Sequence, residues 1–471
     1  MRKTKIICTL GPASANEEVI TALVNAGMNV VRLNFSHGTY EDHAERIEMV
    51  KNVRDRLGVP IAILLDTKGP EYRVGKFAGG KAELKDGDVF LFTADDIQGD
   101  DRRVSVSYKK LAEEMQPGDR ILVNNGLLVF EVTGVHGADV VTKVIAGGVI
   151  SDNKSMSFPG KVLKLPYLSE QDKKDLLFGI EHGIDYVACS FVSCAQDLID
   201  LREFVDANGG EDLLLIAKIE NQAGVDNIDE ICEASDGIMI GRGDMGVEIP
   251  FEELPAIQKH LIMQCRRLGK RVITATEMLE SMISNPRPTR AEISDVANAV
   301  YDGTSAVMLS GETAVGKYPA LTAATMAKIV TETEKNIHYR KRFYATDFKI
   351  KSNIDAVSRS ACTLAMDIDA KAISVCSMSG TTARLVSRFR PPIDIVGICT
   401  DERVYRQLAL AWGVIPVMSE KMPSIEVLFY NAMRLTKRLL SLQKGDNIIV
   451  TGGQMTGAPG HTNTIRIETI D

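Results

Sequence analysis

The chain has 471 residues, of which 45% are hydrophobic and 25% are charged, and its formal net charge at pH 7 is -8. This composition excludes a disordered or fibrous protein and allows two or three domains with cores of their own. The negative charge, with no block of five like charges, argues against nucleic-acid or membrane partners, so a phosphorylated small substrate would need a local positive site.

The N-terminal stretch MRKTKIICTLGPAS breaks at Gly11-Pro12 before any secretory apolar core could form, so it is interpreted as mature protein. No segment approaches about eighteen uninterrupted apolar residues, the length that spans a bilayer. The eight cysteines are scattered, mostly in or beside apolar runs, without a CxxC pair or nearby histidines at zinc-ligand spacing. These features predict a cytoplasmic protein with reduced thiols.

Short apolar runs alternate with amphipathic, helix-like segments through most of the chain. Continuous apolar strands of this kind are typical of a parallel sheet covered on both faces, and eight of them predict a closed (β/α)8 TIM barrel. The runs are KIICTL from Lys5, NVVRLN from Asn29, IAILLD from Ile61, YVACSF from Tyr186, LLLIAK from Leu213, GIMIGR from Gly237, RVITAT from Arg271 and AVMLSG from Ala306.

Two regions interrupt this alternation. Residues 72–166 carry short alternating strands with Gly/Asp turns, which predicts a small β-barrel lid domain inserted after the third barrel strand. The predicted strands lie in KAELKDGDVFLFT, RRVSVSY, GDRILVNNGLLVFEV and ADVVTKV. From residue 345 a second α/β pattern begins, with strands predicted at KAISVCS, IDIVGICT, VIPVM, DNIIVTG and TIRIETI. We therefore expect a barrel domain over 1–71 and 167–344, the lid over 72–166 and a C-terminal α/β regulatory domain over 345–471.

Polar residues gather where the barrel runs end, which is the face that carries the active site in such barrels. A single polar strand end could simply meet solvent, but seven strand ends share the feature. The residues are Arg32, Asn34, Ser36, Asp66, Thr67, Lys68, Ser190, Lys218, Glu220, Arg242, Asp244, Thr276 and Ser310.

Lys218, Glu220 and Asp244 form the strongest group. Side chains two apart on a strand point the same way, so Lys218 and Glu220 should lie side by side, with Asp244 at the next strand end. Two carboxylates without histidine suit Mg²⁺ or Mn²⁺ completed by substrate and water, and the lysine would face a phosphoryl group or oxyanion. The alternative is a surface ion pair.

Further strand ends offer complementary groups. If a helix turn begins near Gly243, its free N–H groups would bind a carboxylate or phosphate, although glycines often just make turns. Thr276 and Ser310 are hydroxyls that could cap helices or join a proton relay, and no histidine or cysteine supports a hydrolase triad.

Neutral oxygens predominate at two neighbouring strand ends. Asn34, Ser36, Asp66 and the Thr67 backbone offer a ligand mix that suits a monovalent cation. Arg32 and Arg73 are natural phosphate ligands because guanidinium donors bind oxygens in pairs. An ion pair from Arg32 to Asp66 or Glu71 is an equally good interpretation.

These motifs, in this order, resemble the pyruvate kinase family over essentially the whole chain. They are KTKIICTLGP, GMNVVRLNFSHG, LLDTKGPEYR, LIAKIENQAGV, IMIGRGDMGVEIP, TATEMLESMI, NPRPTRAE, VMLSGETAVGKYP and the final TNTIR. The resemblance implies transfer of the phosphoryl group of phosphoenolpyruvate to ADP, giving pyruvate and ATP in glycolysis. It also implies Mg²⁺ (or Mn²⁺) and K⁺ as cofactors and a homotetramer.

The resemblance carries roles to individual residues. Glu220 and Asp244 would hold Mg²⁺, and Asn34, Ser36, Asp66 and Thr67 would hold K⁺. Lys218, Arg32, Arg73 and Thr276 would be catalytic, and substrate would contact Arg32, Lys218, Gly243, Asp244 and Thr276. The nucleotide would meet Asn34, His37 and Arg73, Lys68 would be a further phosphate contact, and Glu71 after Gly69-Pro70 favours K⁺ dependence.

Other positions depart from the family pattern or bear on regulation. The departures are Ala223, Glu277, Met245, Ser193 and the lid turn Asn124-Asn125-Gly126. SMSGTTA resembles a sugar-phosphate effector loop, in which Ser377, Ser379, Gly380, Thr381 and Thr382 could hold a phosphate. An ordinary polar turn is the alternative, and with Met378 where some members have lysine, the effector stays unidentified.

Two competing hypotheses fit parts of the sequence. A Mg²⁺-dependent carbon–carbon lyase would use the same metal on a related barrel, but it needs no nucleotide lid. A non-catalytic sensor could keep the fold, but it has no reason to retain Lys218, Glu220, Asp244 and Thr276 together.

Overall fold

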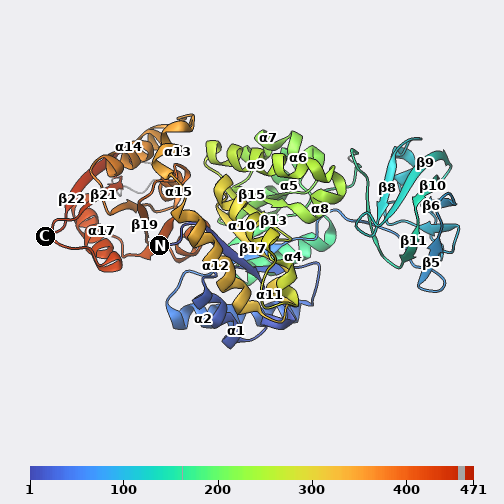
Figure 1. Ribbon diagram of the computed structural model, residues 1–471, viewed down its shortest axis with the longest axis horizontal. Helices are drawn as coiled ribbons and strands as arrows, with labels where there is room; N and C mark the ends of the chain where they lie inside the picture. Colours follow the sequence, from blue (N-terminus) through green and yellow to red (C-terminus); the bar gives the residue numbers. More distant parts are fainter. Residues whose placement is uncertain (162, 454–461) are drawn as a thin grey trace.

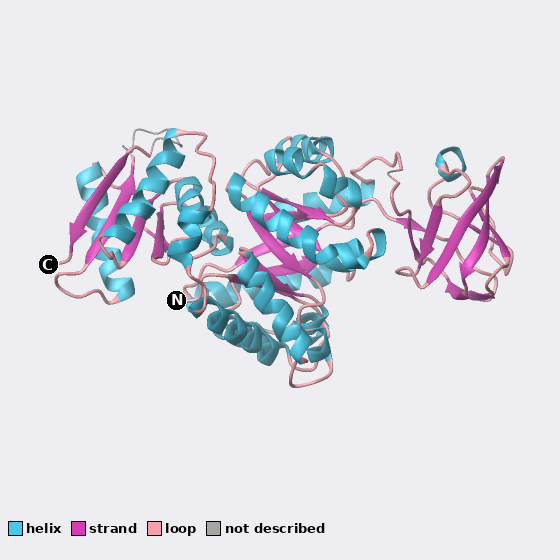
Figure 2. Cartoon of the chain, turned by 45° about the horizontal axis from the view of Figure 1, so that its top comes forward, coloured by secondary structure: helices cyan, strands magenta, loops and turns pink. Residues whose placement is uncertain are grey.

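The structure is a computed structural model that describes residues 1–161, 163–453 and 462–471. Three bodies lie in a row, with a barrel in the middle, a β unit at one end and a C-terminal α/β unit at the other (Figure 1). The same arrangement is visible after rotation, where magenta strands mark the core of each body (Figure 2). No helix among the described residues has the length and apolar character needed to cross a membrane.

The central body is a closed barrel of eight parallel strands in the order β1, β17, β16, β15, β14, β13, β3, β2. Almost every residue of these strands is buried, because helices cover the outside and side chains fill the inside. All eight predicted runs form barrel strands, so the predicted architecture is confirmed. Their bounds are β1 Lys5–Thr9, β2 Val30–Asn34, β3 Ala62–Asp66, β13 Tyr186–Cys189, β14 Leu214–Ile219, β15 Gly237–Gly241, β16 Arg271–Ala275 and β17 Ala306–Leu309.

Helices between the strands begin and end at residues suited to that purpose. In α10, Thr289 and Glu292 form a capping box, and Gly303 ends the helix with φ +101°. The NPRPT motif therefore starts a helix. The barrel helices are α1 Glu17–Ala26, α2 Tyr40–Leu57, α4 Glu170–Glu181, α5 Ala195–Asp206, α6 Gln222–Asp226, α7 Ile228–Ala234, α8 Arg242–Glu248, α9 Leu254–Leu268, α10 Arg290–Asp302, α11 Gly311–Ala314 and α12 Pro319–Lys335.

The β unit follows β3 and is built on a seven-stranded sheet in the order β4, β12, β8, β9, β10, β6, β7. A bridge between Val74 and Val106 joins its two edges, so the sheet rolls into a small barrel around Phe90, Phe92 and Phe130. The short strands β4, β11 and β12 were not predicted. The elements are β4 Tyr72–Arg73, β5 Lys81–Leu84, β6 Val89–Thr93, β7 Arg103–Ser105, α3 Leu111–Glu114, β8 Arg120–Val123, β9 Leu128–His136, β10 Asp139–Ala146, β11 Gly148–Ser151 and β12 Ser155–Ser157.

The C-terminal unit has a five-stranded sheet in the order β20, β19, β18, β21, β22, with only the last pair antiparallel. All five predicted strands are present. The elements are α13 Tyr339–Ala345, α14 Asn353–Asp367, β18 Ala372–Cys376, α15 Thr381–Arg388, β19 Asp394–Cys399, α16 Glu402–Gln407, β20 Val414–Met418, α17 Ile425–Leu440, β21 Asn447–Gly452 and β22 Thr464–Thr469.

The C-terminal unit docks on the face of the barrel where the strands begin. Leu410 packs with the residues that fill the barrel interior, and Lys5 Nζ donates to the Val414 carbonyl at 2.7 Å. Arg406 Nε lies 2.8 Å from Asp185 Oδ1, just before β13. The β unit leaves from the end of β3, so the two smaller bodies occupy opposite faces of the barrel.

Candidate active site

Four charged side chains form a continuous chain at the carboxyl ends of β2, β3 and β14. Arg32 Nε lies 2.6 Å from Asp66 Oδ2, and Asp66 Oδ1 lies 3.1 Å from Lys218 Nζ. Lys218 Nζ continues to Glu220 Oε1 at 3.0 Å. All four residues are buried, so the surface ion pair considered for Lys218 is wrong, whereas the Arg32–Asp66 pair is present.

Ser190, just after β13, completes the hydrogen bonding of Lys218. Its hydroxyl accepts from Lys218 Nζ at 2.7 Å and donates to the Thr67 carbonyl at 2.7 Å. Both oxygens of each of these two carboxylates have a partner. Asp66 binds Arg32 and Lys218, and Glu220 Oε2 accepts from the Phe191 amide at 2.9 Å while its Oε1 binds Lys218. The lysine is therefore held in one position by groups from three strands.

The electrostatics follow from burial and pairing. Burial alone would lower the pKa of Lys218, but Asp66 and Glu220 outweigh it and raise that pKa above its ordinary value. Burial opposes ionisation of Asp66, yet Arg32 and Lys218 hold the pKa of Asp66 below its usual range. Burial raises the pKa of Glu220 to about 7 despite Lys218, partly because Asp244 and Asp66 are negative neighbours. Lys218 is thus held as a cation, whereas the Glu220 carboxyl ionises less readily than a free one.

Thr276 and Gly243 meet at the ends of β16 and β15. The Gly243 amide, in the first turn of α8, donates to Thr276 Oγ1 at 2.8 Å, so the predicted helix start is confirmed and Thr276 caps it. Thr276 has φ +67° and Glu277 has φ +53°, a costly backbone for residues with a side chain. Arg242 supports this turn by donating to the Thr276 carbonyl at 2.5 Å, and Asp295 holds Arg242 at 2.7 Å.

Glu220 and Asp244 differ in accessibility. Glu220 is buried against Gly241, where an added Cβ would lie 2.6 Å from Glu220 Oε1, so glycine is required there. Asp244 is exposed on α8 and forms part of a cavity wall. The described residues include no group of three or more His, Cys, Asp or Glu side chains placed to hold a metal. A divalent cation would therefore have two protein carboxylates, and its charge would favour ionised Glu220, so these residues fit Mg²⁺.

The residues predicted to hold a monovalent cation lie on adjacent strand ends. Asn34 pairs with Asp66 in the register of β2 and β3, and Asn34 Oδ1 accepts from the Ser36 amide at 3.1 Å. Thr67 is buried, whereas Ser36 is exposed. Asp66 contacts Lys218 directly, and Thr67 is linked to Lys218 through Ser190. Asn34 is half-buried at the neighbouring strand end.

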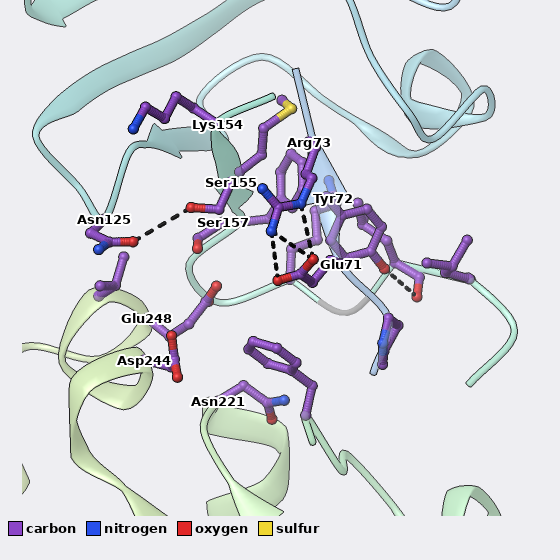
Figure 3. A pocket seen from close by; sticks show the side chains of 18 of the residues that line it. Glu71, Tyr72, Arg73, Asn125, Lys154, Ser155, Ser157, Asn221, Asp244 and Glu248 are labelled. Carbon is purple, nitrogen blue, oxygen red and sulfur yellow. Dashed lines mark hydrogen bonds and ion pairs between the residues drawn. The ribbon is translucent and has the colours of Figure 1, made fainter. Parts of the chain in front are cut away.

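A cavity of about 720 Å³ separates the barrel mouth from the β unit. His37, Arg73 and Asp244 are among its lining residues, and Figure 3 shows Asp244 and Arg73 on opposite sides of it. Arg73 does not join the Lys218 group, because Nε and Nη2 bind Glu71 at 2.9 and 3.1 Å. Lys68 Nζ binds the same carboxylate at 3.1 Å. Lys218, Glu220 and Thr276 are outside the cavity lining.

Glu248, Phe191 and Asp172 contribute to this region and were not predicted from the sequence. Glu248, on α8, faces Ser157 and the Phe158 backbone of the β unit, and burial raises its pKa to about 7. Phe191 has φ +55° and presents its amide to Glu220. The Lys68 and Gly69 amides donate to Asp172 Oδ1 at 3.2 and 3.1 Å. No local pattern signals these partners, because each comes from a distant segment.

Several departures from the family pattern lie at the edge of this region. Ser193 lines the cavity and accepts from Asn221 Nδ2 at 3.2 Å. Asn124 and Asn125 have φ +55° and +56°, which asparagine tolerates well, so they form a tight turn between β8 and β9. Glu277 occupies the strained turn described above. Nothing in the structure explains Ala223.

The SMSGTTA loop lies far from this site, between β18 and α15 in the C-terminal unit. Ser379 Oγ donates to Thr381 Oγ1 at 3.0 Å at the surface, after which Gly380 begins the helix with φ +74°. The Thr382 hydroxyl is buried and hydrogen-bonds Thr462 Oγ1 at 2.6 Å. Met378 is 38% exposed beside the loop.

Comparison with known proteins decides what this arrangement is for. The family described as "Pyruvate kinase, barrel domain" matches residues 1–323, and "Pyruvate kinase, alpha/beta domain" matches residues 355–468. The chain belongs to the pyruvate kinase family.

The relatives match over the full length. The chain is 45% identical over 473 residues to a pyruvate kinase of Clostridium acetobutylicum, and 45% identical over 474 residues to one of Clostridium perfringens, with 100% of each chain covered. A crystal structure of a pyruvate kinase from Cryptosporidium parvum superposes with a TM-score of 0.95 at 37% identity, covering 99% of this chain and 96% of that one.

This membership gives the activity. The enzyme is a phosphotransferase of glycolysis that transfers the phosphoryl group of phosphoenolpyruvate to ADP, giving pyruvate and ATP. The lyase and sensor hypotheses are therefore set aside, and the pyruvate kinase barrel, inserted β unit and C-terminal unit agree with the resemblance found in the sequence.

Gly241→Ala tests the packing of Glu220. The added methyl would meet Glu220 Oε1 at 2.6 Å and displace the carboxylate, so we expect Mg²⁺ affinity to fall about 10- to 100-fold, as when supporting groups of metal ligands are removed. The readout is the Mg²⁺ concentration giving half-maximal turnover. Gly79→Ala is the matched control, because its added Cβ meets nothing closer than 3.9 Å. An unchanged Mg²⁺ dependence in Gly241→Ala would refute the argument.

Proposed function

We propose that Lys218 is the cation that stabilises the phosphoryl group in flight during pyruvate kinase turnover. What supports this role is the single buried ammonium shared by Asp66, Glu220 and Ser190 at the barrel mouth. Phosphoryl transfer needs alignment and charge stabilisation more than covalent help, and a pre-positioned cation in a poorly solvated site supplies both. Arg32, held by Asp66, would be the second positive group on the phosphoryl oxygens.

Glu220 and Asp244 are the proposed ligands of Mg²⁺ (or Mn²⁺). When bound, this cation would neutralise charge on the phosphoryl group that is transferred and on the enolate that remains after the transfer. Gly243 and Asp244 lie in the first turn of α8, which suits binding of the substrate carboxylate. Lys218 would then offset the enolate charge while carbon is protonated.

Thr276 is proposed to act in that protonation step. Its hydroxyl donates to the Ala275 carbonyl at 2.6 Å and accepts from Gly243, so its position depends on both strand ends. Arg242 is a positioning residue here, because it holds the carbonyl groups of the strained turn.

The nucleotide is assigned to the cavity between the barrel and the β unit. Its proposed contacts are Asn34, His37 and Arg73. Arg73 would release the Glu71 carboxylate and bind phosphate oxygens of the nucleotide instead. The β unit would act as a lid that limits access of water to the transferring group. We retain the division into a barrel domain (1–71 and 167–344), a lid (72–166) and a regulatory domain (345–471).

K⁺ is the proposed monovalent cofactor, held by Asn34, Ser36, Asp66 and Thr67. The remaining parts of the proposal are a homotetramer and a cytoplasmic location, which rest on the resemblance to the family. No nucleic-acid or membrane partner is proposed for the −8 chain.

Lys218→Met tests the central assignment. We expect kcat to fall by about 100- to 1,000-fold or more, since removal of one pre-positioned group that stabilises the transition state has that effect. Pyruvate formation from phosphoenolpyruvate and ADP is the measurement, and Lys444→Met, at an exposed lysine, is the control. Because Asp66 and Glu220 lose their shared partner, thermal unfolding should accompany the assay. A folded variant with near-normal kcat would exclude the role.

Glu71 provides a test of K⁺ dependence. We expect turnover with Mg²⁺ to be several-fold higher in K⁺ than in Na⁺ at equal ionic strength. Glu71→Lys should reduce this ratio, because it puts an ammonium four residues after Thr67, where Glu71 now binds the cations Lys68 and Arg73. Glu83→Lys makes the same charge change at an exposed position of β5 and should leave the ratio unchanged. Equal turnover of the parent in K⁺ and Na⁺ contradicts the assignment.

The SMSGTTA loop is proposed to bind a phosphorylated metabolite through Ser377, Ser379, Gly380, Thr381 and Thr382. The exposed hydroxyls of Ser379 and Thr381 support this, whereas Thr382 would contribute its backbone. We expect sugar phosphates to lower the KM for phosphoenolpyruvate, and the double variant Ser379→Ala/Thr381→Val to lose that effect at unchanged basal kcat. Thr325→Val, on the exposed face of α12, is the control. Activation that survives in the double variant would locate the effector elsewhere.

A further inference from the structure

The contact between the barrel and the C-terminal unit contains a dense group of cationic side chains. They surround a small cavity at the end of α9, the beginning of β16 and the last turn of α15, and we call this group the basic cluster. It lies on the face of the barrel opposite the active site. Its members are Arg266, Lys270, Arg271, Arg384, Arg388 and Arg390.

Burial makes this cluster unusual. Arg266, Arg271, Arg388 and Arg390 are only 4%, 6%, 5% and 6% exposed. In each of these four arginines the Nε–H group is buried and has no hydrogen-bond partner among the described residues. Buried polar groups normally have a partner, so four unpartnered donors in one place point to something that accepts from them.

Three carboxylates lie near these six cations, namely Asp355, Asp236 and Glu334, and Glu334 accepts from the Lys3 and Thr4 amides. Asp355 Oδ1 lies 2.9 Å from Arg388 Nη1 and is the one anionic partner of the cluster within the described ion pairs. Asp236 contributes its backbone carbonyl to Arg271 at 3.4 Å, while its side chain binds the Leu215 amide at 2.9 Å. Residues 162 and 454–461, outside the described ranges, include no aspartate or glutamate.

The remaining contacts of the cluster are neutral. Arg390 donates to Ser305 Oγ at 2.9 Å and lies over the Trp412 ring at 4.6 Å, and Arg384 donates to the Gly269 carbonyl. Burial and neighbouring cations lower the pKa of Arg384 to about 10 and hold that of Arg390 well below its ordinary value. Burial is the larger cause in both cases, and a cationic group is costly to bury unless it is paired.

The space at the centre is small. The cavity has a volume of about 10 Å³, which is the room for roughly one water-sized particle. A phosphate or carboxylate compound is larger than this space. A water molecule would fit and satisfy donors, but it would leave the positive charge uncompensated.

We propose that the basic cluster binds one halide-sized inorganic anion, chloride in solution, between the barrel and the C-terminal unit. The anion would accept from the unpartnered Nε–H groups and bridge Arg271 of the barrel to Arg388 and Arg390 of the C-terminal unit. It would thereby stabilise the contact between the two bodies. This site is separate from catalysis and does not depend on the roles proposed for Lys218 or Glu220.

Location is tested by growing crystals of the full chain with potassium bromide in place of potassium chloride. We expect an anomalous bromide peak within the cavity, bonded to arginine nitrogen atoms from both bodies. Absence of a peak there, at bromide concentrations that label other surface positions, overturns the proposal.

Affinity is tested in solution by thermal unfolding at constant K⁺, with chloride exchanged stepwise for gluconate, which is too large for the cavity. We expect the midpoint of the parent to rise by several degrees with chloride and to saturate below about 0.1 M, the ionic strength at which surface charges are already largely screened. Lys218→Met should keep this dependence, because it alters only the other face. A bromide peak without any saturating effect means binding at crystal concentration only and refutes a site of functional affinity.

Variants assign the effect to the cluster. Arg390→Gln should lose the chloride dependence, whereas Arg403→Gln, which removes a cation at the edge of the same unit, should keep it. If Arg390→Gln fails to fold, Arg271→Gln replaces it and the same loss is expected. A chloride dependence that persists in a folded Arg390→Gln or Arg271→Gln variant contradicts the assignment.

Discussion

The active-site end of the barrel depends on one buried ammonium, Lys218, that is shared between Asp66 and Glu220. A lysine in this position is expensive to desolvate unless several partners surround it, and here three strands deliver them. The neighbouring residues are fixed by the same carboxylates. Arg32 binds the second oxygen of Asp66, and the Phe191 amide donates to the second oxygen of Glu220. The parallel barrel brings these residues together because it collects all strand ends on one face.

The two faces of the barrel treat charge in opposite ways. At the carboxyl ends, cations and carboxylates alternate, and the local deficit is a positive charge beside Glu220 and Asp244. At the other face, arginines outnumber carboxylates, so negative charge is in short supply there. Both deficits lie where the barrel meets another body. Ions are the simplest means of completing such contacts, because a small ion supplies charge without enlarging the interface.

Much of the fold could be predicted from sequence because the period of the apolar residues is local. The eight barrel runs and five C-terminal strands are continuous enough to stand out, whereas β4, β11 and β12 are two to four residues long and carry no period. Lys218 beside Glu220 follows from strand geometry alone. Ser190 stood out as a polar strand end, but its bond to Lys218, the bond from the Phe191 amide to Glu220, and the basic cluster follow from contacts between distant segments, so no local pattern could reveal them.

Backbone strain links the remaining parts of the active-site face. Thr276 keeps a left-handed conformation that a β-branched residue disfavours, and the strain is balanced by Arg242, which donates to two successive carbonyl groups and is held by Asp295. Because Thr276 Oγ1 also accepts from the Gly243 amide, the hydroxyl is linked to the start of α8. Asp244 is the next residue on that helix. The position of a carboxylate at the end of β15 is therefore coupled to a hydroxyl at the end of β16 through the Gly243 amide.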